Sequence, residues 1–266
     1  MIIFGEKINT IINNVLVGVE KRDGIFFKNL AKAQLDTGIV DVIDINVGSD
    51  PSIEPDNMRW VVSCIQEALG SEIHLSIDSS TPKTIIAGIQ EIVKKEGNFI
   101  NSITLEENRY KEILPIVKEY NMNLIALPIN GECIPESAYE RLKVAEKICE
   151  LIENYDIDIS KLYIDCIVQP IALSSINVIE SLETIRLIKK HLPFVKTFIC
   201  LTAISLGLPD RKLINRNFLP LLIKEEIDSI ILDPLDKDLI DNLHATNMLL
   251  GKDKDCKNYI NYMRSK

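Results

Sequence analysis

The stretch Ile73-His-Leu-Ser-Ile-Asp78-Ser79-Ser80 decides the fold of this chain, because its pattern recurs along the whole length. A short apolar run ends in the carboxylate of Asp78, and small polar residues and Pro82 follow it. This order predicts a buried strand that carries Asp78 at its C-terminal end and is followed by a helix.

The same unit of a strand followed by a helix recurs along the chain. Strands are predicted over residues 1–4, 41–48, 73–78, 99–103, 124–128, 162–165, 197–201 and 228–234. Helices are predicted over residues 23–36, 58–69, 82–95, 106–120, 136–154, 174–191, 212–225 and 237–250. The strands are apolar almost throughout, as is typical of parallel strands covered on both faces.

This alternation predicts an α/β protein of one domain, a (β/α)8 TIM barrel. The barrel should comprise residues 1–251, and residues 252–266 should form a polar tail that packs on it. An open doubly wound sheet is the alternative. It would be favoured by a glycine-rich phosphate-binding turn after the first strand, and Gly5-Glu6-Lys7-Ile8-Asn9 is not such a turn.

Composition narrows the class of protein further. The net charge of −9 argues against binding of nucleic acid through a basic face. No apolar run approaches the roughly 20 residues that span a bilayer, and the N-terminus lacks a signal-peptide pattern. We therefore expect a soluble, cytoplasmic protein that does not bind membranes. The six cysteines form no C-x-x-C pair, so reduced thiols are expected and a cysteine-bound metal is not.

In a TIM barrel the reactive groups lie at the C-terminal ends of the strands. The residues expected there are mostly carboxylates and amides: Glu6, Asn9, Asp44, Asn46, Asp78, Asn101, Ser102, Asn130, Asp165 and Asp233. Histidine is missing from this set, which argues against a Ser–His or Cys–His nucleophile and against a zinc or iron site. Convergent Asp and Asn side chains suit the donor and acceptor edge of a flat heterocycle, such as the 2-amino-4-oxo edge of a pterin.

Structural roles compete with binding for several of these residues. Asp78 or Ser79 could cap the helix that begins near Pro82. Asp44 and Asn46 could order a loop, and Asp233-Pro234 could form a turn. Asn101 and Asp165 have no comparable structural role, so a binding role is favoured for both.

Six motifs, taken together, resemble a known family, the pterin-binding methyltransferases that move a methyl group between methyltetrahydrofolate and a corrinoid protein. They are Ile3–Asn9, Ile43–Gly48, Ile77–Ser79, Ile100–Ser102, Tyr163–Asp165 and Arg211–Leu219. The C-terminal segments 231–238 and 250–259 resemble the branch that passes methyl groups from methylcorrinoid to tetrahydrofolate in anaerobic demethylation.

The resemblance implies roles for individual residues. It places the pterin-edge contacts, and the catalytic residues, at Asp78 and Asn101, with Asp165 as a further contact. Arg211 matches a loop arginine of the family's site, and Glu6 and Asp44 complete the folate-binding set. The resemblance also implies a homodimer without a metal of its own, because the cobalt belongs to the corrinoid of a partner protein.

The chain departs from the family pattern at one position. The family's seventh strand ends in an asparagine that reaches toward N5 of the folate, and this chain has Ala203 there. Two alternatives to the methyltransferase therefore stay open. One is an enzyme like dihydropteroate synthase, which shares the barrel and the pterin pocket. The other is a folate-binding subunit whose catalysis is weakened by Ala203.

Overall fold

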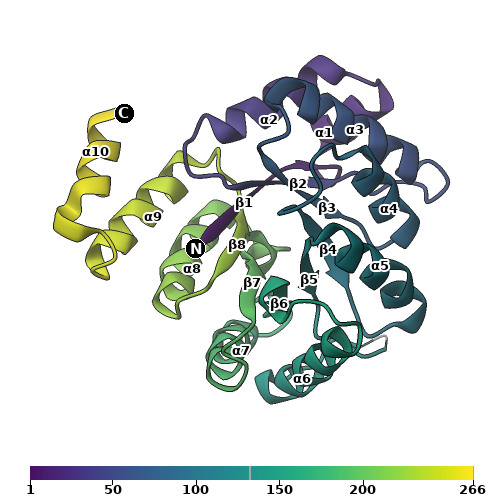
Figure 1. Ribbon diagram of the computed structural model, residues 1–266. Coiled ribbons are helices and arrows are strands. Elements are labelled where there is room, and N and C mark those ends of the chain that lie inside the picture. Colours follow the sequence, from purple (N-terminus) through teal and green to yellow (C-terminus); the bar gives the residue numbers. More distant parts are fainter. Residues whose placement is uncertain (132, 266) are drawn as a thin grey trace.

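The structure, a computed structural model, describes residues 1–131 and 133–265, and in them eight parallel strands close into a barrel in sequence order (Figure 1). The strands are β1 (Ile2–Asn9), β2 (Val42–Asn46), β3 (His74–Asp78), β4 (Phe99–Ile103), β5 (Asn123–Ala126), β6 (Leu162–Asp165), β7 (Lys196–Cys200) and β8 (Ser229–Leu232). The predicted TIM barrel is confirmed, and the open doubly wound sheet is excluded.

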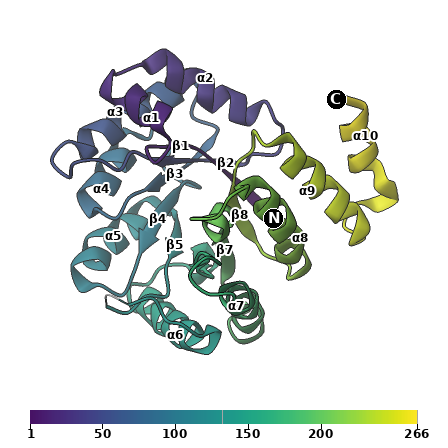
Figure 2. The same cartoon turned by 180° about the vertical axis from the view of Figure 1, so that it is seen from behind.

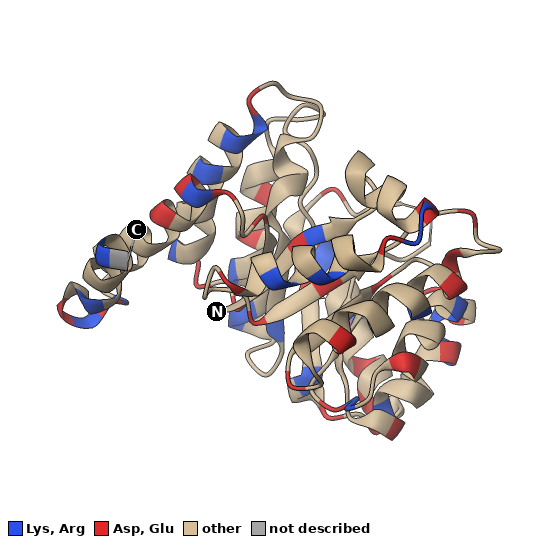
Figure 3. Cartoon of the chain, turned by 90° about the horizontal axis from the view of Figure 1, so that it is seen from above, with Lys and Arg blue, Asp and Glu red and all other residues tan. Residues whose placement is uncertain are grey.

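The helices cover the outside of the barrel, as both views of the ribbon show (Figures 1 and 2). They are α2 (Gly24–Leu35), α3 (Glu54–Leu69), α4 (Pro82–Glu91), α5 (Glu107–Tyr120), α6 (Ala138–Asn154), α7 (Asn177–His191), α8 (Arg211–Lys224) and α9 (Lys237–Leu249). Lys and Arg are interspersed with Asp and Glu on these helices (Figure 3). No helix in the described part of the chain is both long enough and apolar enough to cross a membrane.

Two predictions near the N-terminus were incomplete. The first strand continues to Asn9, so Glu6 lies within β1, where the pairing with β2 shifts register between Gly5 and Ile8. Polar Glu6 and Lys7 hid this half of the strand, because they interrupt the apolar run. A short helix, α1 (Asn13–Glu20), was also missed, since no side chain caps its start.

A layer of side chains fills the barrel interior below the C-terminal ends of the strands. It consists of Phe4, Val42, Phe99, Ile125, Tyr163, Phe198 and Ile231, from every strand except β3. The ring centroids of Phe4 and Phe99 are 4.8 Å apart, and those of Phe99 and Tyr163 are 5.1 Å apart, both edge to face. Close packing of these rings makes the layer a solid floor for the mouth of the barrel.

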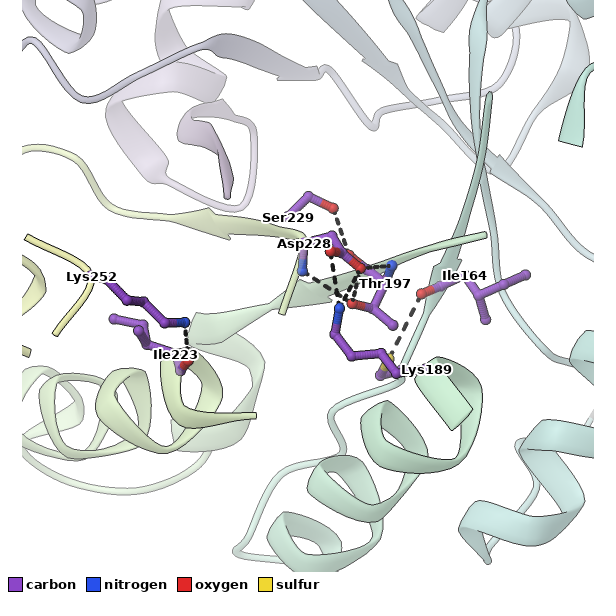
Figure 4. Close-up of polar contacts among 8 residues, drawn as sticks. Ile164, Lys189, Thr197, Ile223, Asp228, Ser229 and Lys252 are labelled. Carbon is purple, nitrogen blue, oxygen red and sulfur yellow. Dashed lines mark hydrogen bonds and ion pairs between the residues drawn. The ribbon is translucent and has the colours of Figure 1, made fainter. Parts of the chain in front are cut away.

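The opposite, amino-terminal end of the barrel is held by Asp228, just before β8 (Figure 4). Its Oδ2 accepts hydrogen bonds from the backbone N–H of Thr197 (2.9 Å) and from Thr197 Oγ1 (2.8 Å). Lys189 of α7 donates to both oxygens of the same carboxylate, at 3.0 and 3.1 Å. These contacts join β7, β8 and α7 at the end of the barrel that lacks the predicted site.

The C-terminal segment leaves the ring of helices after α9. A short turn, η3 (Lys254–Cys256), leads to α10 (Lys257–Ser265), which lies outside α9 in both ribbon views. The ring of Tyr262 stacks on that of His244 at 4.1 Å, and its hydroxyl donates to Asp241 at 2.8 Å. The division of the chain at residue 251 stays a prediction, and residue 266 of the predicted tail lies outside the described residues.

We expect Gly88→Ala to destabilise the fold, because α4 packs closely on β3 at this residue. An added Cβ would lie 2.8 Å from Cγ of Met58 and 2.9 Å from Cγ2 of Ile77, both buried. Overpacking of this kind costs about 1–3 kcal/mol, more than the roughly 1 kcal/mol that alanine gains over glycine in a helix. Urea unfolding measures the difference, with exposed Gln90→Ala on α4 as the control. A variant as stable as the wild type would contradict the close contact.

Candidate active site

A pocket of about 360 Å³ opens at the C-terminal ends of the strands, above the aromatic floor. Of the six residues that the resemblance assigns to the site, five lie in its wall and come from separate elements: Glu6, Asp78, Asn101, Asp165 and Arg211. Asn9 and Ser102, also expected at the strand ends, line the pocket too. Ala203 lies in the same wall, next to Thr202, and Phe198 and Ile231 belong both to the pocket and to the floor. A larger cavity of about 490 Å³ lies at the amino-terminal end, between α8, α9 and the tail, away from all five residues.

Asp78 is held by Asn46 rather than by a helix. Its Oδ2 accepts a hydrogen bond from Asn46 Nδ2 at 2.9 Å, across the paired ends of β2 and β3. The helix α4 begins at Pro82, and its N-cap residue Thr81 makes no side-chain capping hydrogen bond, so Asp78 does not cap the helix. Asn46 also orders a loop, as the alternative reading expected, because its Oδ1 accepts from the N–H of Gly48 at 3.0 Å.

Asp44 lies behind the pocket wall and is 2% exposed. Its Oδ1 accepts a hydrogen bond from Asn101 Nδ2 at 3.4 Å, which orients the Asn101 amide. Burial raises the pKa of Asp44 well above its ordinary value, and the charge of Asp78 raises it further. The structure therefore places Asp44 where it supports Asn101, one layer below the surface that a ligand touches.

Two of the three carboxylates in the wall, Asp78 and Asp165, have similar electrostatic surroundings. Burial raises the pKa of Asp78 to about 6, although the hydrogen bond from Asn46 and the charge of Arg109 oppose the shift. Burial also raises the pKa of Asp165 to about 6, against the hydrogen bond from the N–H of Ile167. That bond, 2.8 Å long, is a structural contact that the sequence did not predict. Burial removes water from around both carboxylates, so a ligand in the pocket can supply the N–H groups that they accept.

Arg109, on the first turn of α5, joins the ends of β3 and β4, and sequence reasoning missed it. Its Nε donates to the carbonyl of Ser102 and its Nη2 to the carbonyl of Ser79, both at 2.9 Å. These carbonyls belong to the residues directly after Asn101 and Asp78, so the guanidinium helps to set the distance between these two residues. One feature of the sequence pointed to Arg109. A cation in the first turn of a helix interacts unfavourably with the helix dipole, so its presence there indicates a specific contact.

A second group of polar contacts lies at the end of β7. The turn η2 (Leu201–Ser205) places Thr202 Oγ1 2.7 Å from Glu6 Oε2, to which it donates. Arg211 fixes this turn, because Nη2 donates to the carbonyl of Thr202 at 2.9 Å and Nε to Ser205 Oγ at 3.1 Å. Burial raises the pKa of Glu6, opposed by the hydrogen bond from Thr202.

The pocket therefore has two polar sides. In the closed order of strands, Asp78, Asn101 and Asp165 lie along the arc from β3 to β6, while Glu6 on β1 and Thr202 and Arg211 after β7 lie along the remaining arc. Within residues 1–131 and 133–265, no three His, Cys, Asp or Glu side chains are grouped so that they could hold a metal ion. His74 begins β3, His191 ends α7 and His244 lies in α9, and none of the three lines the pocket. This arrangement can bind a flat polar ring and exchange a proton with it.

The fold and the site can now be compared with known proteins. The family model described as "Pterin binding enzyme" matches residues 21–231. The methylcorrinoid:tetrahydrofolate methyltransferase of Eubacterium limosum is 30% identical over 261 residues, which cover 97% of this chain and 94% of that one. The methionine synthase of Mycobacterium tuberculosis is 29% identical over 176 residues, which cover 62% of this chain but only 15% of that protein.

Solved structures with the same fold are more distant in sequence. The dihydropteroate synthase from Xanthomonas albilineans in complex with 7,8-dihydropteroate superimposes with a TM-score of 0.66 at 14% identity, over 94% of this chain and 93% of that one. Yersinia pestis DHPS with a pterine-sulfa conjugate gives a TM-score of 0.67 at 13% identity, over 94% of each chain. At this level of identity the likeness concerns the fold alone.

Proposed function

Because the chain belongs to the family of pterin-binding enzymes, we propose that it is a methyltransferase that moves a methyl group between a corrinoid cobalt and N5 of tetrahydrofolate. The observation that carries the proposal is the similarity to the Eubacterium limosum methyltransferase, which extends over 97% of this chain. The favoured direction is from methylcorrinoid to tetrahydrofolate, and the corrinoid is a substrate presented by a partner protein.

The site suits methyl transfer because this reaction depends mainly on how the two reactants are positioned. Asp78, Asn101 and Asp165 bind the 2-amino-4-oxo edge of the pterin, since carboxylates accept its N–H groups and an amide both donates and accepts. The floor of the barrel supports the flat ring, and the mouth stays open to the methyl donor. Holding the two reactants in line replaces a bimolecular encounter with a step of much lower entropic cost.

Dihydropteroate synthase has less support from the same pocket. A reaction with a pyrophosphate leaving group needs a cation near the ends of β7 and β8 that is not already engaged by the protein. Near the end of β7, Arg211 already donates to the Thr202 carbonyl and to Ser205 Oγ. Here β8 is followed by Asp233, whose Oδ2 pairs with Lys7 Nζ at 2.9 Å. Asp233 also forms the predicted turn, because its Oδ1 accepts from the N–H of Leu235 at 3.0 Å.

One experiment tests the proposed function directly. The purified protein is mixed without oxygen with a methylated corrinoid protein and tetrahydrofolate, and the cobalt absorption spectrum is followed. We expect methylcobalt(III) to be converted to cobalt(I), with 5-methyltetrahydrofolate as the product. Tight folate binding without demethylation of any corrinoid partner would contradict the enzyme and leave a folate-binding subunit.

We expect Arg109→Gln to weaken tetrahydrofolate binding about tenfold, because it removes two charge-assisted hydrogen bonds behind Asp78 and Asn101 and loosens their spacing. The charge of Arg109 also lowers the pKa of Asp78, so folate binding by the variant should be lost at a higher pH than in the wild type. Titration calorimetry between pH 6 and 8 measures both effects. Lys118→Gln, an exposed change on the same helix, is the control.

A further inference from the structure

We infer that Thr202 and Glu6 form a proton relay that serves N5 of the folate and thereby replaces the side chain that Ala203 lacks. The inference rests on the proposed function and deepens it, because it assigns the proton transfer that methyl transfer to nitrogen requires. It concerns the side of the pocket opposite Asp78, Asn101 and Asp165.

The placement of N5 follows from the two-sided pocket. A pterin held by its pyrimidine edge at Asp78, Asn101 and Asp165 presents its second ring, which contains N5, to the other side. That side carries the hydroxyl of Thr202 and the carboxyl of Glu6, both in the pocket wall. Ala203 is also in the wall but has no polar side chain, so the neighbouring residue supplies the hydrogen-bonding group.

The hydrogen bond between the two residues has the direction that a relay needs. The Thr202 hydroxyl donates to Glu6 Oε2 at 2.7 Å, which leaves a lone pair of Oγ1 to accept the N5 proton even when Cys200 Sγ, 3.9 Å away, donates to the other one. Arg211 fixes the backbone that carries this hydroxyl, because its Nη2 donates to the carbonyl of Thr202 at 2.9 Å. The contact joins β1 to the turn after β7, across the intervening strand β8.

The chemistry balances with this pair as the proton acceptor. The N5 lone pair of tetrahydrofolate attacks the methyl carbon and forms the N–C bond. The Co–C bond breaks, and its electron pair stays on the metal, so cobalt(III) becomes cobalt(I). N5 is then a cationic amine, and its proton passes to Thr202 Oγ1 while the Thr202 proton passes to the Glu6 carboxylate. In the reverse direction the same relay protonates N5 of 5-methyltetrahydrofolate before the methyl group leaves.

The surroundings of Glu6 favour its neutral, protonated form more than water does, so its pKa is raised above the ordinary value. Its pKa is raised by burial and by Asp233, and it is lowered by the Thr202 hydrogen bond and by Lys7 and Arg211. Lys7 is itself paired with Asp233 at 2.9 Å, which limits how far it can hold Glu6 ionised. Asp44, on β2, is a further carboxylate within electrostatic reach of Glu6.

The contact could instead be only a structural tie between β1 and η2, and matched variants separate the two roles. Thr202→Val keeps the shape but removes the hydroxyl, and Thr202→Ser restores it. Glu6→Gln keeps an acceptor oxygen but cannot take a proton. Glu20→Gln, on the exposed end of α1, is the matched control. If the contact is only structural, Thr202→Val and Glu6→Gln should lower the stability of the protein. If it is a relay, they should lower the rate of methyl transfer.

The experiment is single-turnover methyl transfer between free methylcob(III)alamin and tetrahydrofolate, run in both directions. General acid–base catalysis contributes about 100-fold or more, so Glu6→Gln and Thr202→Val should lose about this factor equally in both directions. Their dissociation constants for tetrahydrofolate should stay within about threefold of the wild type. Glu20→Gln should retain the wild-type rate, and Thr202→Ser should recover most of the rate that Thr202→Val loses. Wild-type rates in Glu6→Gln and Thr202→Val would overturn the relay and leave the methyltransferase intact.

A second measurement needs no methyl transfer and so separates failure of the relay from failure of the proposed function. The ultraviolet spectrum of bound 5-methyltetrahydrofolate is followed against pH to report protonation at N5. We expect N5 to be protonated at a higher pH in the wild type and in Thr202→Ser than in Glu6→Gln and Thr202→Val. Identical titrations in all four proteins would overturn the relay even if the enzyme transfers methyl groups.

Discussion

Asp78→Ala should weaken tetrahydrofolate binding by about 100-fold or more. In the proposed complex the Asp78 carboxylate accepts two N–H groups of the pterin edge. A hydrogen bond to a charged group contributes about 1.5–3 kcal/mol, and each 1.4 kcal/mol changes the dissociation constant tenfold. The two bonds together therefore account for at least two orders of magnitude. Titration calorimetry at pH 7.5, above the pKa of about 6, measures the effect with Asp78 ionised.

Two companion variants make this result specific. Asp78→Asn keeps one acceptor oxygen and the contact with Asn46, so its affinity should fall between those of wild type and Asp78→Ala. Asp56→Ala, at an exposed position of α3, should bind folate like the wild type. Binding that is unchanged in Asp78→Ala would mean that the carboxylate only orders the ends of β2 and β3, through Asn46.

The recurrence of the strand and helix unit was enough to predict the barrel and most of the pocket. An apolar run followed by Asp or Asn marks a strand end, and parallel strands in a closed barrel bring all their C-terminal ends to one mouth. Asp78, Asn101 and Asp165 therefore converge, although about 90 residues separate the first from the last. Their proposed roles, by contrast, still depend on binding measurements.

The depth of a side chain in the pocket was not predictable from its own strand. Asp44 and Asn46 lie two residues apart and point to the same side of β2. The pairing with β3 sets Asn46 opposite Asp78 and Asp44 opposite Ser76, one layer further down. Asp44 thus binds Asn101 and lies outside the pocket wall. Which layer a residue occupies is decided by strand register, which a local apolar pattern does not contain.

Contacts between segments far apart in the chain could not be predicted either, because they also depend on how whole strands are placed in the barrel. Thr202 and Glu6 are 196 positions apart, and neither lies in a pattern that points to the other. Arg109 binds two backbone carbonyls. Every residue has a backbone carbonyl, so the residue types in the sequence do not indicate this contact. Such pairs follow only from the positions of whole elements around the barrel.

Asp165→Asn should make the protein without ligand more stable above pH 6 while it weakens folate binding. Burial raises the pKa of Asp165 from 3.8 to about 6 in the folded protein, so the folded state binds more protons than the unfolded state between these values. The stability that this protonation provides is fully present below about pH 3.8, and it is lost as the pH rises through about 6. At neutral pH the ionised carboxylate therefore destabilises the fold by about 2–3 kcal/mol.

The neutral amide of Asn removes this penalty and keeps the oxygen that accepts from the N–H of Ile167. Urea unfolding at pH 7.5 should show a gain of about 1–3 kcal/mol, and the gain should fall to about a third of that value at pH 4.5 and vanish below about pH 3.8. Glu20→Gln, at an exposed site, should show no such pH dependence. A gain that is equal at both pH values, or a loss at pH 7.5, would mean that Asp165 is not held in a setting that disfavours its charge. The opposite changes in stability and in affinity would identify Asp165 as a residue kept for binding at the expense of the fold.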